Sequence, residues 1–185
     1  MMERLKNWLP LVALGLVAAV TMVACNDSTD DPGISENLVT VSSVAPLNAC
    51  VDVDGKLVDL DGDGTKETTV YESVIQEINF DSRLRGTAAG AFNDVIFSTV
   101  NINYILDGSA PPNRTEAVTI TVPAGETAAQ ELTTVLATDI AAGYFSLGEG
   151  GRIDLIFHGE DASGEPMTAR GQIPVETATG CGNTP

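Results

Sequence analysis

The feature that most constrains this chain is a series of short runs in which apolar and polar residues alternate. Alternation with a period of two places apolar side chains on one face of a β-strand. Residues 95–106 form the strongest run, and 38–44, 69–80, 118–122, 153–157 and 167–175 are further candidates. In the strongest run, Asn101 and Asn103 oppose an apolar face made of Ile96, Val100, Ile102, Tyr104 and Leu106.

Turn-forming clusters rich in Gly, Pro, Asn, Asp and Ser separate these runs. They occupy residues 107–113, 123–125, 148–151 and 159–165, and the last joins two alternating runs as expected for a hairpin. The spacing predicts an all-β fold, an antiparallel β-sandwich of about seven strands, with a barrel as the alternative. The pattern resembles an immunoglobulin-like module. Residues 128–140 fit either a helical stripe or a strand.

The N-terminus carries Arg4 and Lys6, then an apolar segment over residues 8–23 that ends in Met22-Val23-Ala24-Cys25. This order is typical of a secretory signal peptide, and the segment is short of the roughly 20 residues that a spanning helix needs. The four residues resemble the lipobox of bacterial lipoproteins. The resemblance implies removal of a signal peptide over residues 1–24 and acylation of Cys25.

A polar, acidic segment follows the lipobox-like sequence and predicts a flexible, lipidated tether over residues 25–37, ahead of a β-sandwich domain over residues 38–185. The tether would hold the domain close to the membrane of a bacterial cell envelope. Sorting in this lipoprotein class depends on the residues after the cysteine. Because Asn26 follows Cys25 and Asp27 comes one position later, the outer membrane is favoured over the inner membrane.

The chain is strongly acidic, with 9 basic and 26 acidic residues. Residues 1–24 include Glu3, Arg4 and Lys6, so 7 basic and 25 acidic residues remain without them. This balance repels nucleic acid and anionic lipid headgroups. The expected contacts are the membrane through the lipid on Cys25 and a protein or polysaccharide partner in the envelope.

The chain has three cysteines. With Cys25 acylated, Cys50 and Cys181 remain in an oxidising compartment, where one disulfide is the simplest outcome. Two free thiols, or an intermolecular bridge, are the alternative.

One segment, Asp59-Leu60-Asp61-Gly62-Asp63-Gly64-Thr65-Lys66-Glu67, indicates metal chemistry. Carboxylates at alternate positions converge when the loop curls, and calcium prefers six to eight hard oxygen ligands. The expected ligands are the carboxylates of Asp59, Asp61 and Asp63, the backbone carbonyl of Thr65, and Glu67, directly or through water. A plain acidic turn is the alternative.

The segment resembles the D-x-D-x-D-G calcium loops of EF-hands, integrin-type propellers and thrombospondin-type repeats. The EF-hand needs a bidentate Glu at loop position twelve, where this chain has Val70, and the flanks here indicate strand. The prediction is therefore a weak calcium site without the EF-hand fold.

Other chemistry has less support in the sequence. His158 is the only histidine, so a zinc site or a catalytic triad would depend on it alone. Tyr71, Tyr104 and Tyr144 are better explained by core packing than by a sugar site. The favoured function is a non-catalytic binding or assembly module. A calcium-dependent adhesion or carbohydrate-binding module is the first alternative, and a hydrolase with a dispersed carboxylate site is the second.

Overall fold

The computed structural model describes residues 37–84 and 94–181. The signal peptide, Cys25 and residues 25–36 of the expected tether lie outside this part. Within it, no helix is both long and apolar enough to cross a membrane. The elements are β1 (Asn37–Ala45), β2 (Ala49–Asp52), β3 (Lys56–Val58), β4 (Thr68–Val70), β5 (Val74–Leu84), β6 (Val95–Leu106), β7 (Arg114–Val122), β8 (Thr127–Val135), α1 (Ala137–Ala141), β9 (Gly150–Asp161) and β10 (Pro166–Ala178).

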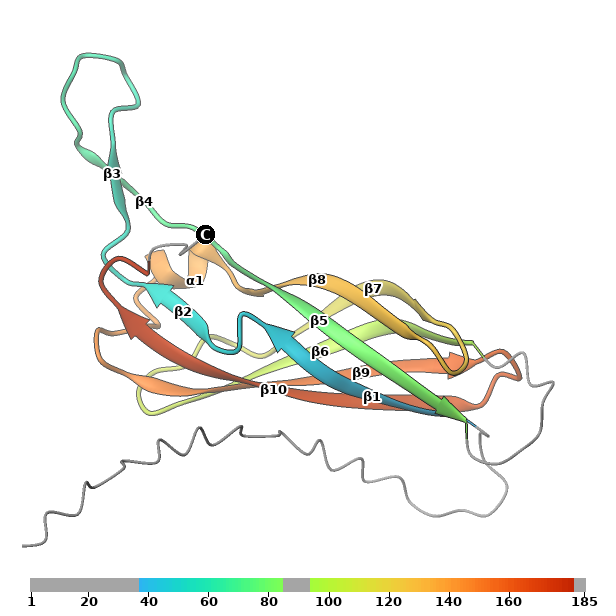
Figure 1. Cartoon of the computed structure of the whole chain (residues 1–185). Coiled ribbons are helices and arrows are strands. Elements are labelled where there is room, and N and C mark those ends of the chain that lie inside the picture. Colours follow the sequence, from blue (N-terminus) through green and yellow to red (C-terminus); the bar gives the residue numbers. More distant parts are fainter. Residues whose placement is uncertain (1–36, 85–93, 182–185) are drawn as a thin grey trace, which may run out of the picture.

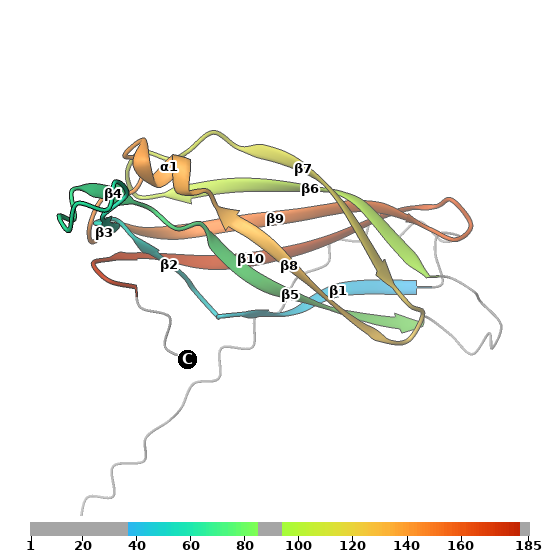
Figure 2. The same ribbon diagram turned by 90° about the horizontal axis from the view of Figure 1, so that it is seen from above.

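The strands form two long sheets that pack face to face, with a separate two-stranded hairpin at one end (Figures 1 and 2). One sheet has the order β1-β5-β8, and the other has the order β2-β10-β9-β6-β7. Pairing is antiparallel throughout these sheets, apart from β2, which runs parallel to β10. The predicted all-β sandwich is confirmed, and its ten described strands exceed the expected seven or so.

The extra strands come from short segments that alternation does not reveal. β2 and β3 have four and three residues. The expected single run over residues 69–80 is divided, because β4 pairs with β3 outside the sandwich whereas β5 lies between β1 and β8. The ambiguous segment over residues 128–140 is mostly strand β8, followed by the short helix α1.

A bulge in β6 changes one expected face. The pairing of β6 with both neighbours shifts between Phe97 and Thr99. An extra residue in one strand reverses the side-chain alternation beyond it. Phe97 is therefore buried and Ile96 exposed, whereas the uninterrupted pattern placed Ile96 on the apolar face.

The centre of the sandwich is a cluster of three phenylalanine rings. Phe80 of β5 meets Phe97 of β6 and Phe157 of β9, with ring centroids 5.5 and 5.0 Å apart. All three side chains are fully buried. Aromatic pairs at these distances stabilise a core beyond their buried area by about 0.5–1.5 kcal/mol each. This cluster joins the two sheets.

Gln76 explains why the alternation of β5 is irregular in the sequence. Its side chain is buried in phase with Ile78 and Phe80. The amide nitrogen donates to the carbonyl of Pro46, 3.0 Å away, and the amide oxygen accepts from the hydroxyl of Thr134. A buried amide is tolerated because both of its polar atoms are paired. Ile75 consequently faces outward.

The strand register defines two ends of the domain. The first, called the entry end, is where Asn37 begins β1 opposite Leu84 and where Val95 of β6 pairs with Asp161 of β9. The second, called the arm end, is where Leu106 of β6 pairs with Gly151 of β9 and where β10 runs alongside β2 up to Ala178. The β3–β4 hairpin, called the arm from here on, projects from this second end (Figure 1).

The predicted disulfide between Cys50 and Cys181 is present, with the two Cα atoms 5.7 Å apart. It lies at the arm end and joins β2 to the segment that follows β10. The bond closes a loop over a sequence separation of 131 residues. In the chain-entropy model, a loop of this length corresponds to about 4–5 kcal/mol of stabilisation.

We therefore expect the double variant Cys50→Ala/Cys181→Ala, made in residues 26–185, to lose about 4–5 kcal/mol of unfolding free energy. Guanidinium denaturation measures the loss. Reductant should destabilise the unmodified domain similarly and leave the double variant unaffected. Equal denaturation midpoints for the two proteins would contradict the prediction.

Candidate functional site

The arm carries the acidic segment at its tip. β3 and β4 pair antiparallel over three residues, with Lys56 opposite Val70, Leu57 opposite Thr69 and Val58 opposite Thr68. The segment from Asp59 to Glu67 connects them and stands clear of the sandwich (Figure 1). Its flanks are strands, as the sequence indicated, so the EF-hand arrangement is absent here.

Three carboxylates of the segment converge. One ligand oxygen from each of Asp59, Asp61 and Asp63 can be chosen so that all lie within 4.8 Å of one another. Calcium binds oxygen at about 2.3–2.6 Å, so two ligands of one ion lie at most about 5 Å apart. The three side chains therefore fit a single cation, with Asp59 half-buried and the other two exposed.

Asp59 organises the loop. Its Oδ1 accepts the Gly62 N–H at 2.7 Å, and its Oδ2 accepts the Gly64 N–H at 2.8 Å. The hydrogen bonds from Gly64 and Gly62 hold the pKa of the Asp59 carboxyl below its ordinary value. The carboxylate is thus ionised at neutral pH, and each oxygen keeps a lone pair that could meet a cation.

Two glycines allow the chain to curl around Asp59. Gly62 and Gly64 have φ angles of 79° and 91°, in a region where residues with a Cβ are strained. Asp61 and Asp63 each accept the N–H two residues further on, at 3.2 and 2.7 Å. Short-range bonds of this kind favour a tight turn. The spacing of Asp and Gly in the sequence therefore specifies the loop locally.

The other two predicted ligands, Thr65 and Glu67, remain predictions. Glu67 is exposed and does not belong to the group of three carboxylates found among the described residues. Thr65 uses its N–H to donate to Asp63. Asp52, at the end of β2, lies at the root of the arm, where its Oδ1 accepts the N–H groups of Asp54 and Gly180 at 3.2 Å each.

The root of the arm is hydrogen-bonded to the end of β10 and to the start of α1. Val53 donates its N–H to the carbonyl of Ala178, at the end of β10. On the other side, the Ser73 hydroxyl accepts the N–H of Ala137, next to β8. Gly55 lies so close to β4 that an added Cβ would be 2.8 Å from a Thr69 carbon and 2.9 Å from the Val70 carbonyl oxygen. The two hydrogen bonds tie the root to the rest of the domain, and the close approach at Gly55 holds the two sides of the arm together.

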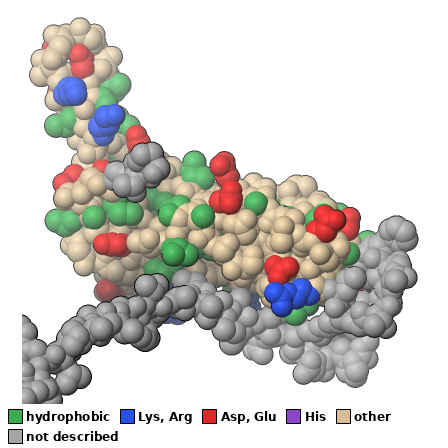
Figure 3. Space-filling model, viewed as in Figure 1, with side chains coloured by type: hydrophobic (Ala, Val, Ile, Leu, Met, Phe, Trp, Pro, Cys, Tyr) green, Lys and Arg blue, Asp and Glu red, His purple; other side chains and the backbone are tan. Residues whose placement is uncertain are grey.

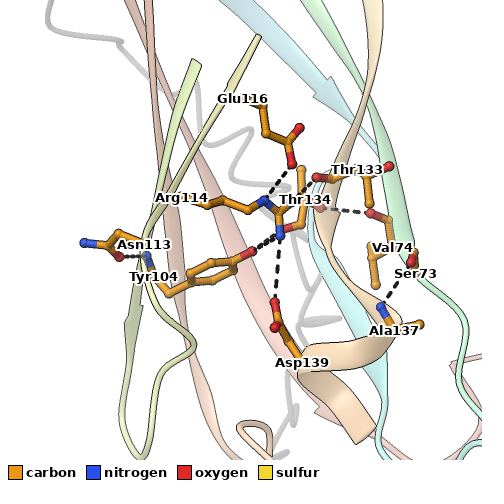
Figure 4. A network of polar contacts seen from close by, with 10 residues as sticks. All are labelled: Ser73, Val74, Tyr104, Asn113, Arg114, Glu116, Thr133, Thr134, Ala137 and Asp139. Atoms are coloured by element: carbon orange, nitrogen blue, oxygen red, sulfur yellow. Dashed lines mark hydrogen bonds and ion pairs between the residues drawn. The ribbon is translucent and has the colours of Figure 1, made fainter. Parts of the chain in front are cut away.

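A buried polar network lies between the sheets at the arm end (Figure 4). Arg114 of β7, only 15% exposed, forms ion pairs with Glu116 at 2.7 Å and Asp139 at 3.8 Å. Its guanidinium also donates to the Tyr104 hydroxyl and to the carbonyl of Thr133. The Tyr104 hydroxyl donates to the carbonyl of Thr134 at 2.7 Å. The network connects β6 and β7 to β8 and α1.

This network was not foreseen from the sequence, because its members come from distant segments. Tyr104 is 6% exposed, which agrees with the expected core role rather than a sugar site. His158 is exposed on β9, and its Nε2 lies 3.1 Å from the side-chain nitrogen of Asn101. Neither residue joins the acidic loop at the tip of the arm.

Comparisons with protein-family models, curated proteins and solved structures gave no match for this chain.

The buried hydroxyl of Tyr104 predicts how the unfolding free energy changes at alkaline pH. Burial raises the pKa of the Tyr104 hydroxyl to about 12, although the charge of Arg114 partly opposes this. The unfolded chain loses this proton near pH 10, so the stabilisation is complete below pH 10 and is lost as pH rises towards 12. Between pH 9.5 and 11, the unfolding free energy should fall by about 1 kcal/mol more in the wild type than in Tyr104→Phe.

Denaturant melts of both proteins across this pH range measure the difference. Because all other titrating groups are shared, parallel curves for the two proteins would contradict the assignment.

Proposed function

We propose that this chain is a membrane-tethered, non-catalytic binding or assembly module whose arm holds a weak structural calcium site. The observation that supports this best is the convergence of Asp59, Asp61 and Asp63 at the tip of the arm, clear of the sandwich core. A cation there would act on the shape of the arm. It would hold the curled loop together by neutralising carboxylates that otherwise repel one another.

The donor set favours calcium. Three aspartates supply hard oxygens on an exposed, glycine-containing loop that can adjust its geometry. Magnesium demands near-ideal octahedral geometry and keeps its waters, so it fits less well. The twelfth position of the segment is Val70, in β4 opposite Lys56, so the site lacks the acid that an EF-hand has there. We expect a dissociation constant of about 10⁻⁴–10⁻³ M, as in extracellular modules.

The tether is the second part of the proposal. Acylation of Cys25 would attach the N-terminal segment to a membrane of the cell envelope, with the outer membrane favoured. The domain would then act near that surface on a protein or polysaccharide partner. The disulfide supports an extracytoplasmic location, because such bonds persist mainly in oxidising compartments.

Calcium should stabilise the domain. At ten times the dissociation constant, an ion that binds only the native state adds about 1.4 kcal/mol to the unfolding free energy. For a domain of this size, this corresponds to about 3–5 °C in melting temperature. Asp61→Ala should abolish the increment and leave the melt in chelator unchanged, because the side chain lies outside the core.

The matched control is Asp54→Ala, which removes an exposed aspartate at the root of the arm, outside the group of three. It should keep the full calcium increment, and magnesium should produce a smaller one. Identical melting temperatures with calcium and with chelator would show that the segment is a plain acidic turn that binds no calcium. An equal calcium increment in Asp61→Ala would do the same.

The lipid anchor is tested separately. Intact-mass analysis of the membrane fraction should find a chain that begins at Cys25 and carries acyl groups. Cys25→Ser should release the domain from the membrane, because the cysteine thiol is the acylation site. A soluble mature chain without acyl mass would disprove the anchor.

A further inference from the structure

Exposed aliphatic side chains are unevenly distributed over the domain. Eight large hydrophobic side chains are exposed in the described part of the chain. Only Ile96, which is 46% exposed, lies towards the entry end, where it pairs with Glu160 and Thr121. Ile105 is on β6 at the arm end, next to Arg152. Of the other six, Leu57, Leu60 and Val70 lie on the arm, and Ile75 lies at the start of β5, directly after the arm; these four are called the arm surface. Leu47 and Leu147 lie in loops of the sandwich, before β2 and before β9.

The arm itself has no role in the core that would explain its apolar residues. β3 and β4 pair only with each other in the described sheets. Leu57 and Leu60 are 52% and 71% exposed. In Figure 3, hydrophobic side chains are visible along the arm and over the adjoining part of the sandwich. Exposed aliphatic groups concentrated on a projecting element are typical of surfaces that another molecule covers.

The charge around these groups restricts what can cover them. Between Val53 and Val70, the chain carries five acidic residues and two lysines. Near the root, Glu77 of β5 and Glu131 of β8 are directly opposite each other, and both are exposed. Like charges in this arrangement destabilise a sheet unless a cationic group approaches them. Even with one divalent cation at the tip, the arm keeps a net negative charge.

We propose that the arm surface is the docking site for a protein partner that presents aliphatic and basic side chains. Anionic lipid, nucleic acid and a second copy of this chain all carry negative charge and would be repelled. A neutral polysaccharide would leave the carboxylates of the arm without a counter-charge. A basic protein satisfies both the apolar and the acidic features, and its charge also steers the encounter.

The position of the arm agrees with such a partner. The N-terminal segment joins the domain at Asn37, at the entry end, whereas the arm projects from the opposite end (Figures 1 and 2). A domain attached through that segment would direct the arm away from its own anchor. This inference rests on the proposed binding function and names the surface and the partner's chemistry.

The test is site-specific photocrosslinking of the full-length protein in its native membranes. A photoreactive residue is placed at Leu57 or Leu60, and at Ile96 as a control whose exposure is similar to that of Leu57. We expect both arm positions to yield the same basic protein, identified by mass spectrometry, and Ile96 to yield none of it.

Affinity measurements on the identified protein complete the test. Leu57→Ser/Leu60→Ser should weaken its binding by at least about tenfold, because a few fully desolvated side chains at the centre of an interface carry most of the binding energy. Ile96→Ser should leave the affinity unchanged. Raising the salt from about 50 to 500 mM should weaken binding by at least about fivefold, as expected for opposite charges.

Three results would overturn the docking site. Adducts from the arm that contain only lipid or a second copy of this chain would exclude a basic protein partner. Absence of any adduct from the arm would do the same. A partner crosslinked from Ile96 but not from the arm would place binding elsewhere and leave the proposed binding function intact. The calcium melts remain independent of all three.

Discussion

The parallel pairing of β2 with β10 is the constraint on which the arm end of this protein depends. The chain leaves one sheet after Ala45 and joins the other at Ala49, alongside Val175. Because the two strands run in the same direction, both end at the arm end of the domain. This arrangement places Cys50 and Cys181 within bonding distance. The arm therefore follows a strand that the disulfide ties to the segment after β10. An antiparallel β2 would direct the following segment towards the entry end instead.

Buried polar groups brace the smaller sheet and connect it to the larger one. Gln76 of β5 is hydrogen-bonded to the carbonyl of Pro46, in the turn between β1 and β2, and to Thr134 of β8. Arg114 and Tyr104 connect the larger sheet to the carbonyls of β8 and to α1. Each buried hydrogen bond contributes about 1 kcal/mol, whereas an unpaired group would cost more. The arm therefore emerges from a rigid support, although the arm is itself only three residue pairs long.

The fixed root and the exposed tip of the arm agree with the separate roles proposed for the sandwich, the cation and the arm surface. The sandwich positions the arm, a cation would stiffen the loop around Asp59, and the aliphatic groups of the arm surface would meet the partner. A two-stranded ribbon alone is marginally stable in water, so an arm of this kind needs its fixed root. The acidic tip also discourages the arms of two copies from pairing edge to edge.

The sequence by itself determined the local features. Alternation of apolar and polar residues predicted most of the sandwich strands, since side-chain period depends only on neighbouring residues. The Asp and Gly spacing predicted the curled acidic loop for the same reason, and the cysteine count predicted the disulfide. Only the tertiary structure decided the rest. It placed Ile96 outside and Phe97 inside through a bulge, and it buried Gln76 because Pro46 and Thr134 meet it from distant segments. The arm, its position opposite Asn37 and the Arg114 network likewise depend on long-range pairing, which local residue patterns do not encode.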